Sequence, residues 1–169
     1  MSKDILILGA GESGVGAAKL ALTLGHTPFV SDAGEGKAAF LAELDAEGIC
    51  YEVGGHNPGV WPKVKTVVKS PGIPEDVAIV KNLRDSGAEV ISEIEYASRH
   101  YSGKVIAITG ANGKTTTTAL IYKILSDAGV NAICVGNIGT SWAREMSERK
   151  DSADVVVVET SSFQLDGTT

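Results

Sequence analysis

The chain has 169 residues, of which 43% are hydrophobic and 21% are charged, and 20 are glycine. The apolar content is sufficient for a core, and the length suits one large domain or two small ones, since domains mostly contain about 100 to 150 residues. The formal net charge of -6, without a long run of Lys or Arg, argues against a surface that binds nucleic acid or an anionic membrane. Signal-peptide architecture and long apolar stretches are absent from the sequence, so we expect a soluble, cytoplasmic monomer.

Metal-ligand spacing is missing among the cysteines and histidines. Cys50 and Cys134 are isolated, and in a cytoplasmic chain we expect both to be reduced core residues. His26, His56 and His100 are scattered and predict no metal cluster.

The first 32 residues follow the order of a Rossmann-like unit. Residues 4–8 predict an apolar strand of a parallel sheet covered on both faces. The motif Gly9-Ala-Gly-Glu-Ser-Gly14 comes next, then an Ala- and Leu-rich helix at 15–24, a strand at 27–31 and Asp32, 18 residues after the last glycine. In such a unit the helix N-terminus binds a pyrophosphate, and the acid accepts a hydrogen bond from a ribose hydroxyl or a base N–H. The glycine pattern alone is weak evidence, because a tight turn without a ligand needs the same residues.

The following residues continue the alternation of strands and helices. The loop Ser70-Pro-Gly-Ile-Pro74 follows a strand; its prolines and Gly72 suit either a loop that faces a ligand or a rigid turn. We predict helices at 36–48, with Phe40, Leu41 and Leu44 inward, and at 77–86, strands at 50–53, 66–69 and 89–91, and a helix that opens at Ser92 to Glu95. These elements complete a doubly wound α/β domain, which we assign to residues 1–93.

Residues 105–118, Val-Ile-Ala-Ile-Thr-Gly-Ala-Asn-Gly-Lys-Thr-Thr-Thr-Thr, predict a strand, a glycine-rich phosphate cradle and a helix. Backbone N–H groups at the helix start favour an anion, Lys114 supplies a charge for the β- and γ-phosphates, and the Thr115 hydroxyl can bind Mg²⁺. The general P-loop pattern has glycine where Ile108 stands, so the motif is a shortened one. The alternative is a flexible turn with a solvated lysine.

The helix after the cradle is predicted to extend to residue 128. Its apolar positions recur at three and four residues, so we expect one buried stripe. The stripe consists of Leu120, Ile121, Ile124, Leu125 and Ala128.

Two later strands end in polar residues. A strand at 131–135 leads into Gly136-Asn-Ile-Gly139 and a short helix around Trp142, which places Asn137 at the crevice of an open α/β sheet or simply in a turn. Four valines at 155–158 predict a buried strand that ends in Glu159. A buried carboxylate needs a partner, so Glu159 predicts a magnesium ligand. The alternative is that Glu159 caps a helix that starts at Thr160, Ser161 and Ser162.

Five motifs in this order resemble those of the MurD branch of the Mur ligase family. They are Gly-x-Gly-x-Ser-Gly, Ser-Pro-Gly-Ile-Pro, Thr-Gly-Ala-Asn-Gly-Lys-Thr-Thr, Gly-Asn-Ile-Gly and Glu-x-Ser-Ser-Phe-Gln-Leu. Ala111 stands where the family usually has threonine, a change that a loop binding through backbone N–H groups should tolerate. The resemblance covers essentially all 169 residues, but only the first domain and part of the second of a three-domain family protein.

The resemblance implies an α/β fold, with a Rossmann-like domain at 1–93, the first part of a P-loop central domain at 94–169, and the C-terminal domain absent. It also implies an ATP- and Mg²⁺-dependent amide ligase of peptidoglycan precursor synthesis. Such an enzyme converts UDP-N-acetylmuramoyl-L-alanine to an acyl phosphate, which D-glutamate then attacks. We expect the chain alone to bind ligand without turnover.

The resemblance also assigns the site residues. Lys114 and Glu159 would be catalytic. Thr115 and Glu159 would bind magnesium. The UDP precursor would contact Glu12, Ser13, Gly14, Asp32 and Gly72, with Asn137 and Ser161 at its muramoyl end, and the ATP phosphates would contact Gly110, Ala111, Asn112, Gly113, Lys114, Thr115 and Thr116.

Two other function classes remain open. An NAD-dependent oxidoreductase would account for residues 4–32 but would leave the cradle and Glu159 without a role. A non-catalytic nucleotide-binding module is the second alternative.

Overall fold

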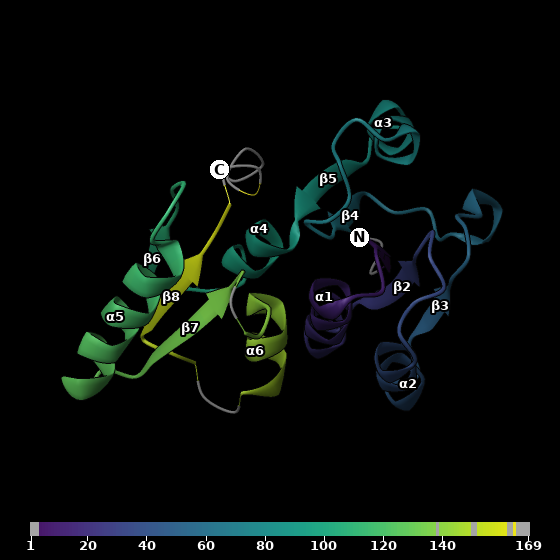
Figure 1. Ribbon diagram of the computed structural model, residues 1–169. Coiled ribbons are helices and arrows are strands. Elements are labelled where there is room, and N and C mark those ends of the chain that lie inside the picture. Colours follow the sequence, from purple (N-terminus) through teal and green to yellow (C-terminus); the bar gives the residue numbers. More distant parts are fainter. Residues whose placement is uncertain (1–3, 138, 150–151, 162–163, 165–169) are drawn as a thin grey trace.

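The structure is a computed structural model that describes residues 4–137, 139–149, 152–161 and 164. Its strands form two parallel sheets that lie side by side (Figure 1). In the first sheet the spatial order is β3 (Cys50–Glu52), β2 (Thr27–Ser31), β1 (Asp4–Leu8), β4 (Thr66–Lys69) and β5 (Glu89–Ser92). In the second it is β6 (Lys104–Ile108), β8 (Val155–Glu159) and β7 (Ala132–Gly136).

The helices connect and cover these strands, and they confirm the predicted α/β fold class. They are α1 (Glu12–Thr23), α2 (Ala38–Ala46), α3 (Ala78–Asp85), α4 (Glu93–Ser98), α5 (Lys114–Asp127) and α6 (Trp142–Glu148), with a 3-10 turn at Pro58–Val60. The predicted helices and strands are all present, and their observed ends lie within three residues of the predicted ones.

Strand β1 occupies the centre of the first sheet because both of its faces are apolar. Ile5 and Ile7 belong to the core cluster that includes residues of α1 and α4. Leu6 and Leu8 alternate with them and pack in a separate cluster with Val80 of α3. Helices therefore cover both faces of the sheet, as the doubly wound prediction requires.

The order of the first sheet reverses at β1. The chain passes from β1 to β2 and β3 on one side, then returns to β4 and β5 on the other. Leu8 pairs with Ser31 of β2 and with Lys69 of β4, so these three strands end at the same edge. In an open α/β sheet this reversal leaves a crevice beyond the carboxyl ends of the strands.

The second sheet is built around β8. The four valines of this strand are buried, as predicted, and β6 and β7 flank it. The register places both Ile108 of β6 and Gly136 of β7 beside Glu159. Glu159 thus lies next to the strand that leads into the cradle.

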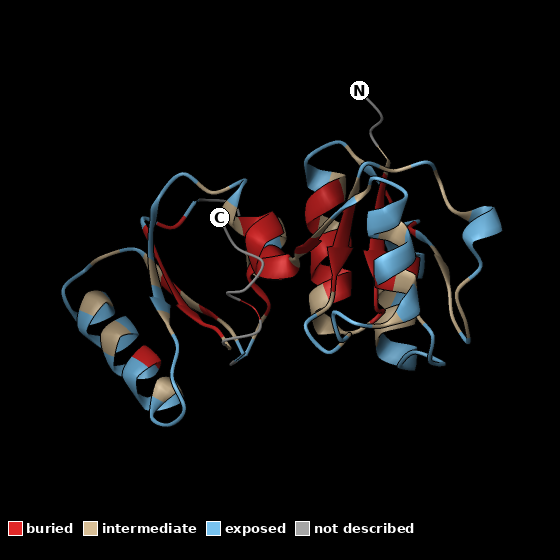
Figure 2. Ribbon diagram, turned by 90° about the horizontal axis from the view of Figure 1, so that it is seen from above, coloured by how far each residue is buried: buried red, intermediate tan, exposed pale blue. Residues whose placement is uncertain are grey.

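Helix α5 differs from the prediction in its burial. Leu120 and Ile124 are each 58% exposed, whereas Thr118 is the buried residue of the helix. The predicted stripe is therefore wrong as a buried feature, although Ile121 and Leu125 are half-buried. Helix α5 lies at the outer side of the second sheet, and Figure 2 shows most of its surface exposed. Periodicity predicts the helix, but it does not predict whether a partner covers it.

Helices α1, α4 and α6 join the two sheets into one core. Trp142 of α6 is buried in the same cluster as Ala17 of α1 and Tyr96 of α4. The approach of α6 to α1 depends on Gly16, because a Cβ atom there would lie 2.4 Å from Ser141 Oγ and 2.8 Å from the backbone nitrogen of Arg144. The division of the chain at residue 93 remains a prediction.

The cysteines correct a further expectation. Both are free, but Cys50 is exposed and Cys134 is half-buried, so neither is a fully buried core residue. Cys50 begins the edge strand β3, where a side chain is only partly covered.

Candidate functional site

A cavity of about 700 Å³ lies beyond the carboxyl ends of β1, β2 and β4, a volume typical of small-molecule sites. We call it the first cavity. It brings together four predicted substrate residues, Glu12, Ser13, Asp32 and Gly72. Its full lining is Gly9, Gly11, Glu12, Ser13, Asp32, Ala33, His56, Ser70, Pro71, Gly72, Ile73, Pro74, Val77, Ala78 and Ile79.

Gly14 is the one predicted substrate residue of the first domain outside this lining. A Cβ atom at Gly14 would lie 1.8 Å from the carbonyl oxygen of Gly9, so this glycine allows α1 to pack closely on the end of β1. Gly11, by contrast, lines the cavity, and a Cβ atom there would meet nothing within 4 Å. Gly14 and Gly11 therefore have the separate roles that a phosphate-binding turn requires, close helix packing and open backbone toward a ligand.

Asp32 closes the turn between β1 and α1. Its Oδ2 accepts a hydrogen bond from the backbone N–H of Ala10 at 2.5 Å, and its Oδ1 accepts one from Gly34 at 2.7 Å. Each carboxylate oxygen can accept a second hydrogen bond. The arrangement holds the acid at the cavity edge with capacity left for a hydroxyl or N–H group of a ligand.

His56 enters the first cavity from the loop after β3. Ser31 Oγ donates to Glu52 Oε1 at 2.6 Å and lies 2.7 Å from His56 Nδ1. Because a hydroxyl carries one hydrogen, Ser31 must accept a hydrogen from Nδ1, and in the neutral ring Nε2 is then the acceptor.

Glu52 supports this arrangement by remaining ionised. Burial acts to raise the pKa of its carboxyl, but hydrogen bonds from Asn57 N–H, Ser31 and Trp61 outweigh burial and lower the pKa. An ionised Glu52 can only accept hydrogen bonds, which fixes the direction of the Ser31 hydroxyl.

The Pro71–Pro74 loop separates the first cavity from a second one of about 700 Å³. Lys69 holds this loop, since its Nζ donates to the carbonyl oxygen of Ile73 at 2.6 Å and pairs with Glu75 at 3.0 Å. The second cavity also includes Ser161 and Gln164, which follow β8. The predicted residue Ser161 thus lies against the carboxyl edge of the first sheet, but it lines a different cavity from Asp32.

The cradle has the backbone geometry of a helix N-terminus. Gly113, with φ of +77°, is the N-cap of α5, and Gly110 has φ of +145°. Lys114 Nζ donates to the carbonyl oxygen of Gly110 at 2.7 Å, so the side chain folds back over the turn. The predicted phosphate-binding backbone is open to solvent, since its residues Gly110 to Gly113, Thr115 and Thr116 are exposed.

Glu159 is 4% exposed, and its Oε2 is buried without a hydrogen-bond partner among the described residues. Such a carboxylate oxygen is costly unless a cation or donor reaches it. Burial, and next the negative charge of Glu159, raise the pKa of the neighbouring Cys134. The donor set, a buried carboxylate beside the cradle strand and the hydroxyl of Thr115 at the start of α5, fits a magnesium ion.

The alternative of Glu159 as a helix cap is not favoured. Ser161 Oγ accepts from the backbone N–H of Gln164, and Gln164 Oε1 accepts from the N–H of Ser161 at 2.8 Å. This reciprocal pair is a capping box, so Ser161 takes the capping role. Ser162, which was predicted to share the helix start, lies outside the described residues.

Asn137 lies at the end of β7. Its backbone N–H donates to the carbonyl oxygen of Glu159 at 3.0 Å, and its side chain is exposed. The structure thus places Asn137 beside Glu159, whereas neither cavity includes it.

Three residues of this region were not predicted. His56 and Ser70 line the first cavity, and the buried Ser70 Oγ has no hydrogen-bond partner in the described structure. Ser70 opens the loop that was predicted either to face a ligand or to form a rigid turn. Both residues lie in loops that follow parallel strands, and this position could have identified them. Arg144 contacts Glu12 at the cavity edge, and its sequence context gives no signal for this contact.

Among the described residues there is no group of three or more His, Cys, Asp or Glu side chains that could hold a metal ion. None of the helices within the described ranges has the length and apolar character to cross a bilayer.

The fold and these sites define an α/β protein with parallel strands that end in glycine-rich turns. The profile of the Mur ligase MurD-like N-terminal domain matches residues 3–92, and that of the Mur ligase middle domain matches residues 108–168. The chain therefore belongs to the Mur ligase family, in its MurD-like branch.

Individual relatives agree with this membership. The chain is 52% identical over 168 residues to the UDP-N-acetylmuramoylalanine--D-glutamate ligase of Cytophaga hutchinsonii, covering 98% of this chain and 37% of that protein. It is 50% identical over 164 residues to the ligase of the same name from Bacteroides fragilis, covering 97% and 36%. The chain thus spans little more than a third of these relatives' length.

A solved structure shares the arrangement of both sheets. The murein peptide ligase Mpl of Psychrobacter arcticus aligns with a TM-score of 0.60 and 27% identity, over 95% of this chain and 39% of that one.

Proposed function

We propose that this chain is the nucleotide-binding part of an ATP-dependent ligase that adds D-glutamate to UDP-N-acetylmuramoyl-L-alanine in the cytoplasm, during synthesis of the peptidoglycan precursor. The proposed substrates are those in the names of relatives that are 50% and 52% identical to the chain. The observation that carries a phosphoryl-transfer chemistry is the buried Oε2 of Glu159 beside the cradle strand, which has no hydrogen-bond partner among the residues that the structure describes. A dehydrogenase would give that oxygen no role.

In the proposed mechanism the first cavity holds the UDP part of the precursor. The N-terminus of α1 directs backbone N–H groups at the diphosphate, while Asp32 and the Nε2 atom of His56 are acceptors for hydroxyl or base N–H groups. The precursor then extends toward Asn137 and Ser161, where its alanine carboxylate meets the γ-phosphate of ATP.

The cradle residues position that phosphate. Lys114, whose Nζ lies on the Gly110 carbonyl, exchanges this contact for phosphate oxygens, and the N–H groups of residues 110–116 surround the phosphate chain. Thr115 and Glu159 would hold Mg²⁺, which when bound neutralises charge on the transferred phosphoryl group. The amine of D-glutamate then attacks the acyl carbon of the acyl phosphate formed on alanine; the C–N bond forms as the bond from that carbon to the phosphate oxygen breaks, and inorganic phosphate leaves.

The chain by itself should bind the precursor without turnover. Ligation requires both reactants in near-attack geometry, which can contribute about 7 to 11 kcal/mol, and the exposed cradle here would leave an acyl phosphate open to water.

We therefore expect the 169-residue chain to bind UDP-N-acetylmuramoyl-L-alanine in a calorimetric titration. A chromatographic assay with ATP, Mg²⁺ and D-glutamate should detect no product. Tight binding of NAD without a response to UDP would contradict the proposed function. Product at even about one per cent of the rate of the protein at its natural length would contradict the inactivity of the chain, since positioning alone accounts for larger factors.

A further inference from the structure

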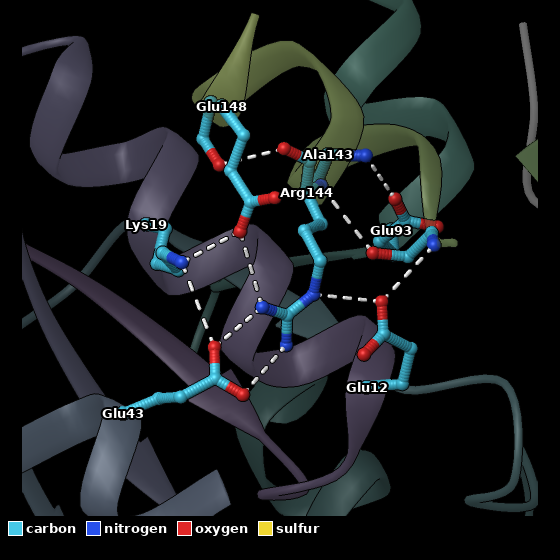
Figure 3. Close-up of polar contacts among 9 residues, drawn as sticks. Glu12, Lys19, Glu43, Glu93, Ala143, Arg144 and Glu148 are labelled. Atoms are coloured by element: carbon cyan, nitrogen blue, oxygen red, sulfur yellow. Dashed lines mark hydrogen bonds and ion pairs between the residues drawn. The ribbon is translucent and has the colours of Figure 1, made fainter.

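An ion-pair cluster centred on the buried Arg144 lies where α6 meets α1 and α2 (Figure 3). Arg144 of α6 is 8% exposed, and its guanidinium reaches carboxylates from three helices. Nε lies 2.8 Å from Glu12 Oε1, and Nη1 lies 2.5 Å from Glu43 Oε2 and 3.3 Å from Glu148 Oε1. Lys19 is the second cation and pairs with Glu148 at 2.7 Å and with Glu43 at 3.5 Å.

Glu12 belongs to this cluster and also to the lining of the first cavity. It is the first residue of α1, the position at which backbone N–H groups would meet a diphosphate. Its Oε1 is turned toward α6, where it accepts from Arg144 Nε and from the backbone N–H of Ser141 at 3.2 Å. In the described structure Lys19 contacts Glu43 and Glu148, and Arg144 is the cation that faces Glu12.

The contact between Arg144 and Glu12 matters because of the charge of the first cavity. Its described lining contains two carboxylates, Glu12 and Asp32, and neither lysine nor arginine. A diphosphate that enters the cavity therefore meets no cationic side chain in this lining. An unpaired Glu12 would repel it across a short distance in a partly desolvated site.

We propose that Arg144 is a positioning residue for the diphosphate subsite: it neutralises Glu12 and holds its carboxylate against α6, which makes the first cavity compatible with an anionic ligand. The choice of UDP as ligand rests on the proposed function. Since Arg144 lies beyond the cradle in the sequence, the anion affinity of a cavity lined by residues 9–79 depends on a helix of the second unit.

A purely structural role for Arg144 makes a different prediction. If Arg144 only attaches α6 to α1, its removal should weaken uridine and UDP alike, and removing Glu12 as well should not restore binding. If Arg144 acts by charge, the loss should be confined to phosphate-bearing ligands. Removal of the carboxylate should then reverse it.

The test is a set of calorimetric titrations of the 169-residue chain at low ionic strength with UDP, uridine and inorganic pyrophosphate. For Arg144→Met we expect UDP and pyrophosphate to bind about tenfold more weakly, while the dissociation constant for uridine changes less than about twofold. Glu12→Gln should bind UDP at least as tightly as the wild type. The double variant should return to within about threefold of it.

Two controls separate charge from folding. Lys123→Met removes one positive charge from an exposed pair with Asp127 on α5, away from the cluster, and should leave all three titrations unchanged. Arg144→Lys keeps the charge but loses the forked contact with Glu12 and Glu43, and should bind UDP between Arg144→Met and wild type. Circular dichroism of each variant verifies that the chain is folded.

Specific outcomes would overturn the inference. They are an equal loss of uridine and UDP affinity in Arg144→Met, or a double variant that binds UDP no better than Arg144→Met. A wild type that binds NAD tightly and shows no response to UDP would overturn the proposed function alone, because the charge order among the variants can still be measured with NAD, which also carries a diphosphate. A wild type that binds no diphosphate overturns both.

Discussion

The two sheets of this chain differ in how far their surroundings are complete. In the first, helices cover both faces, and the first cavity is bounded by loops that follow β1, β2, β3 and β4 of the same sheet. In the second, β8 is buried, but Val105 of the edge strand β6 is 45% exposed and the outer face of α5 is open. Under the proposed function, this difference implies that the chain supplies a binding site and only one side of a catalytic site. Binding and turnover should therefore respond to different substitutions.

The largest effect is expected at the cradle. In a ligase of the relatives' full length that contains this chain, Lys114→Ala and Glu159→Ala should each reduce kcat by about 10²- to 10³-fold, as losses of electrostatic transition-state stabilisation do. Raised magnesium should partly rescue Glu159→Ala alone. UDP binding to the first cavity should be unchanged in both variants. Steady-state kinetics and calorimetry measure the two quantities, and near-normal turnover in either variant would remove that residue from the catalytic set.

A stability comparison follows directly from burial. Leu6 is fully buried in the first sheet, so Leu6→Ala should lower the free energy of unfolding by about 2 to 5 kcal/mol. Leu120 is also a leucine but lies on the exposed face of α5, so Leu120→Ala should change the free energy of unfolding by less than about 0.5 kcal/mol. Urea denaturation measures both. Equal losses would show that α5 is covered in solution.

The contact between α4 and α6 should respond to pH through Glu93. Burial raises the pKa of its carboxyl to about 7, against the opposing effect of the hydrogen bond from Ala143 N–H, and the charge of Glu12 raises it further. The folded chain thus holds a proton that the unfolded chain releases near pH 4.5, so the stability contributed by protonated Glu93 is full below that pH and is lost as pH rises through 7.

Replacement by an amide should remove this pH dependence. Glu93→Gln keeps an oxygen acceptor for Ala143 N–H, and it should stabilise the chain at pH 8 relative to wild type by up to about 3 kcal/mol. The difference should shrink toward pH 5. Thermal melts of both proteins across this range provide the measurement, and parallel curves would mean that Glu93 is ionised throughout.

The smallest effect concerns the base end of the first cavity. Asp32→Ala removes the carboxylate oxygens that accept hydrogen bonds from two backbone N–H groups and, in the proposed site, from the ligand. It should weaken UDP binding about tenfold, near 1.4 kcal/mol. Asp85→Ala, at the far end of α3, is the matched control. Unchanged affinity in Asp32→Ala would place the base elsewhere in the cavity.

The sequence was sufficient for those parts of the site that depend on local patterns. The glycine motif with Asp32 and the valine strand that ends in Glu159 each combine a strand end with a polar residue, and parallel strands bring such ends to one edge. The contact between Arg144 and Glu12 joins residues 132 positions apart. It depends on how α6 docks on α1, which no local pattern encodes.

The exposure of Leu120 and Ile124 has a related origin. Their spacing is that of a buried helix face, and it correctly predicts α5. Whether such a face is covered depends on the presence of another element beside it, and this information lies outside the helix. The same reasoning applies to Cys50, whose burial was inferred from residue type but is set by the edge position of β3.

The close approach of α6 to α1 at Gly16 leaves no room for a side chain. One methyl group at this position would push against Ser141 Oγ and the backbone of Arg144, on the same two residues that hold Glu12. Gly16→Ala should therefore push α6 away from α1 without altering any charge. It separates α6 from α1 by steric means alone. Its effect on ligand binding can therefore be compared with the effects of the charge substitutions in the neighbouring ion-pair cluster.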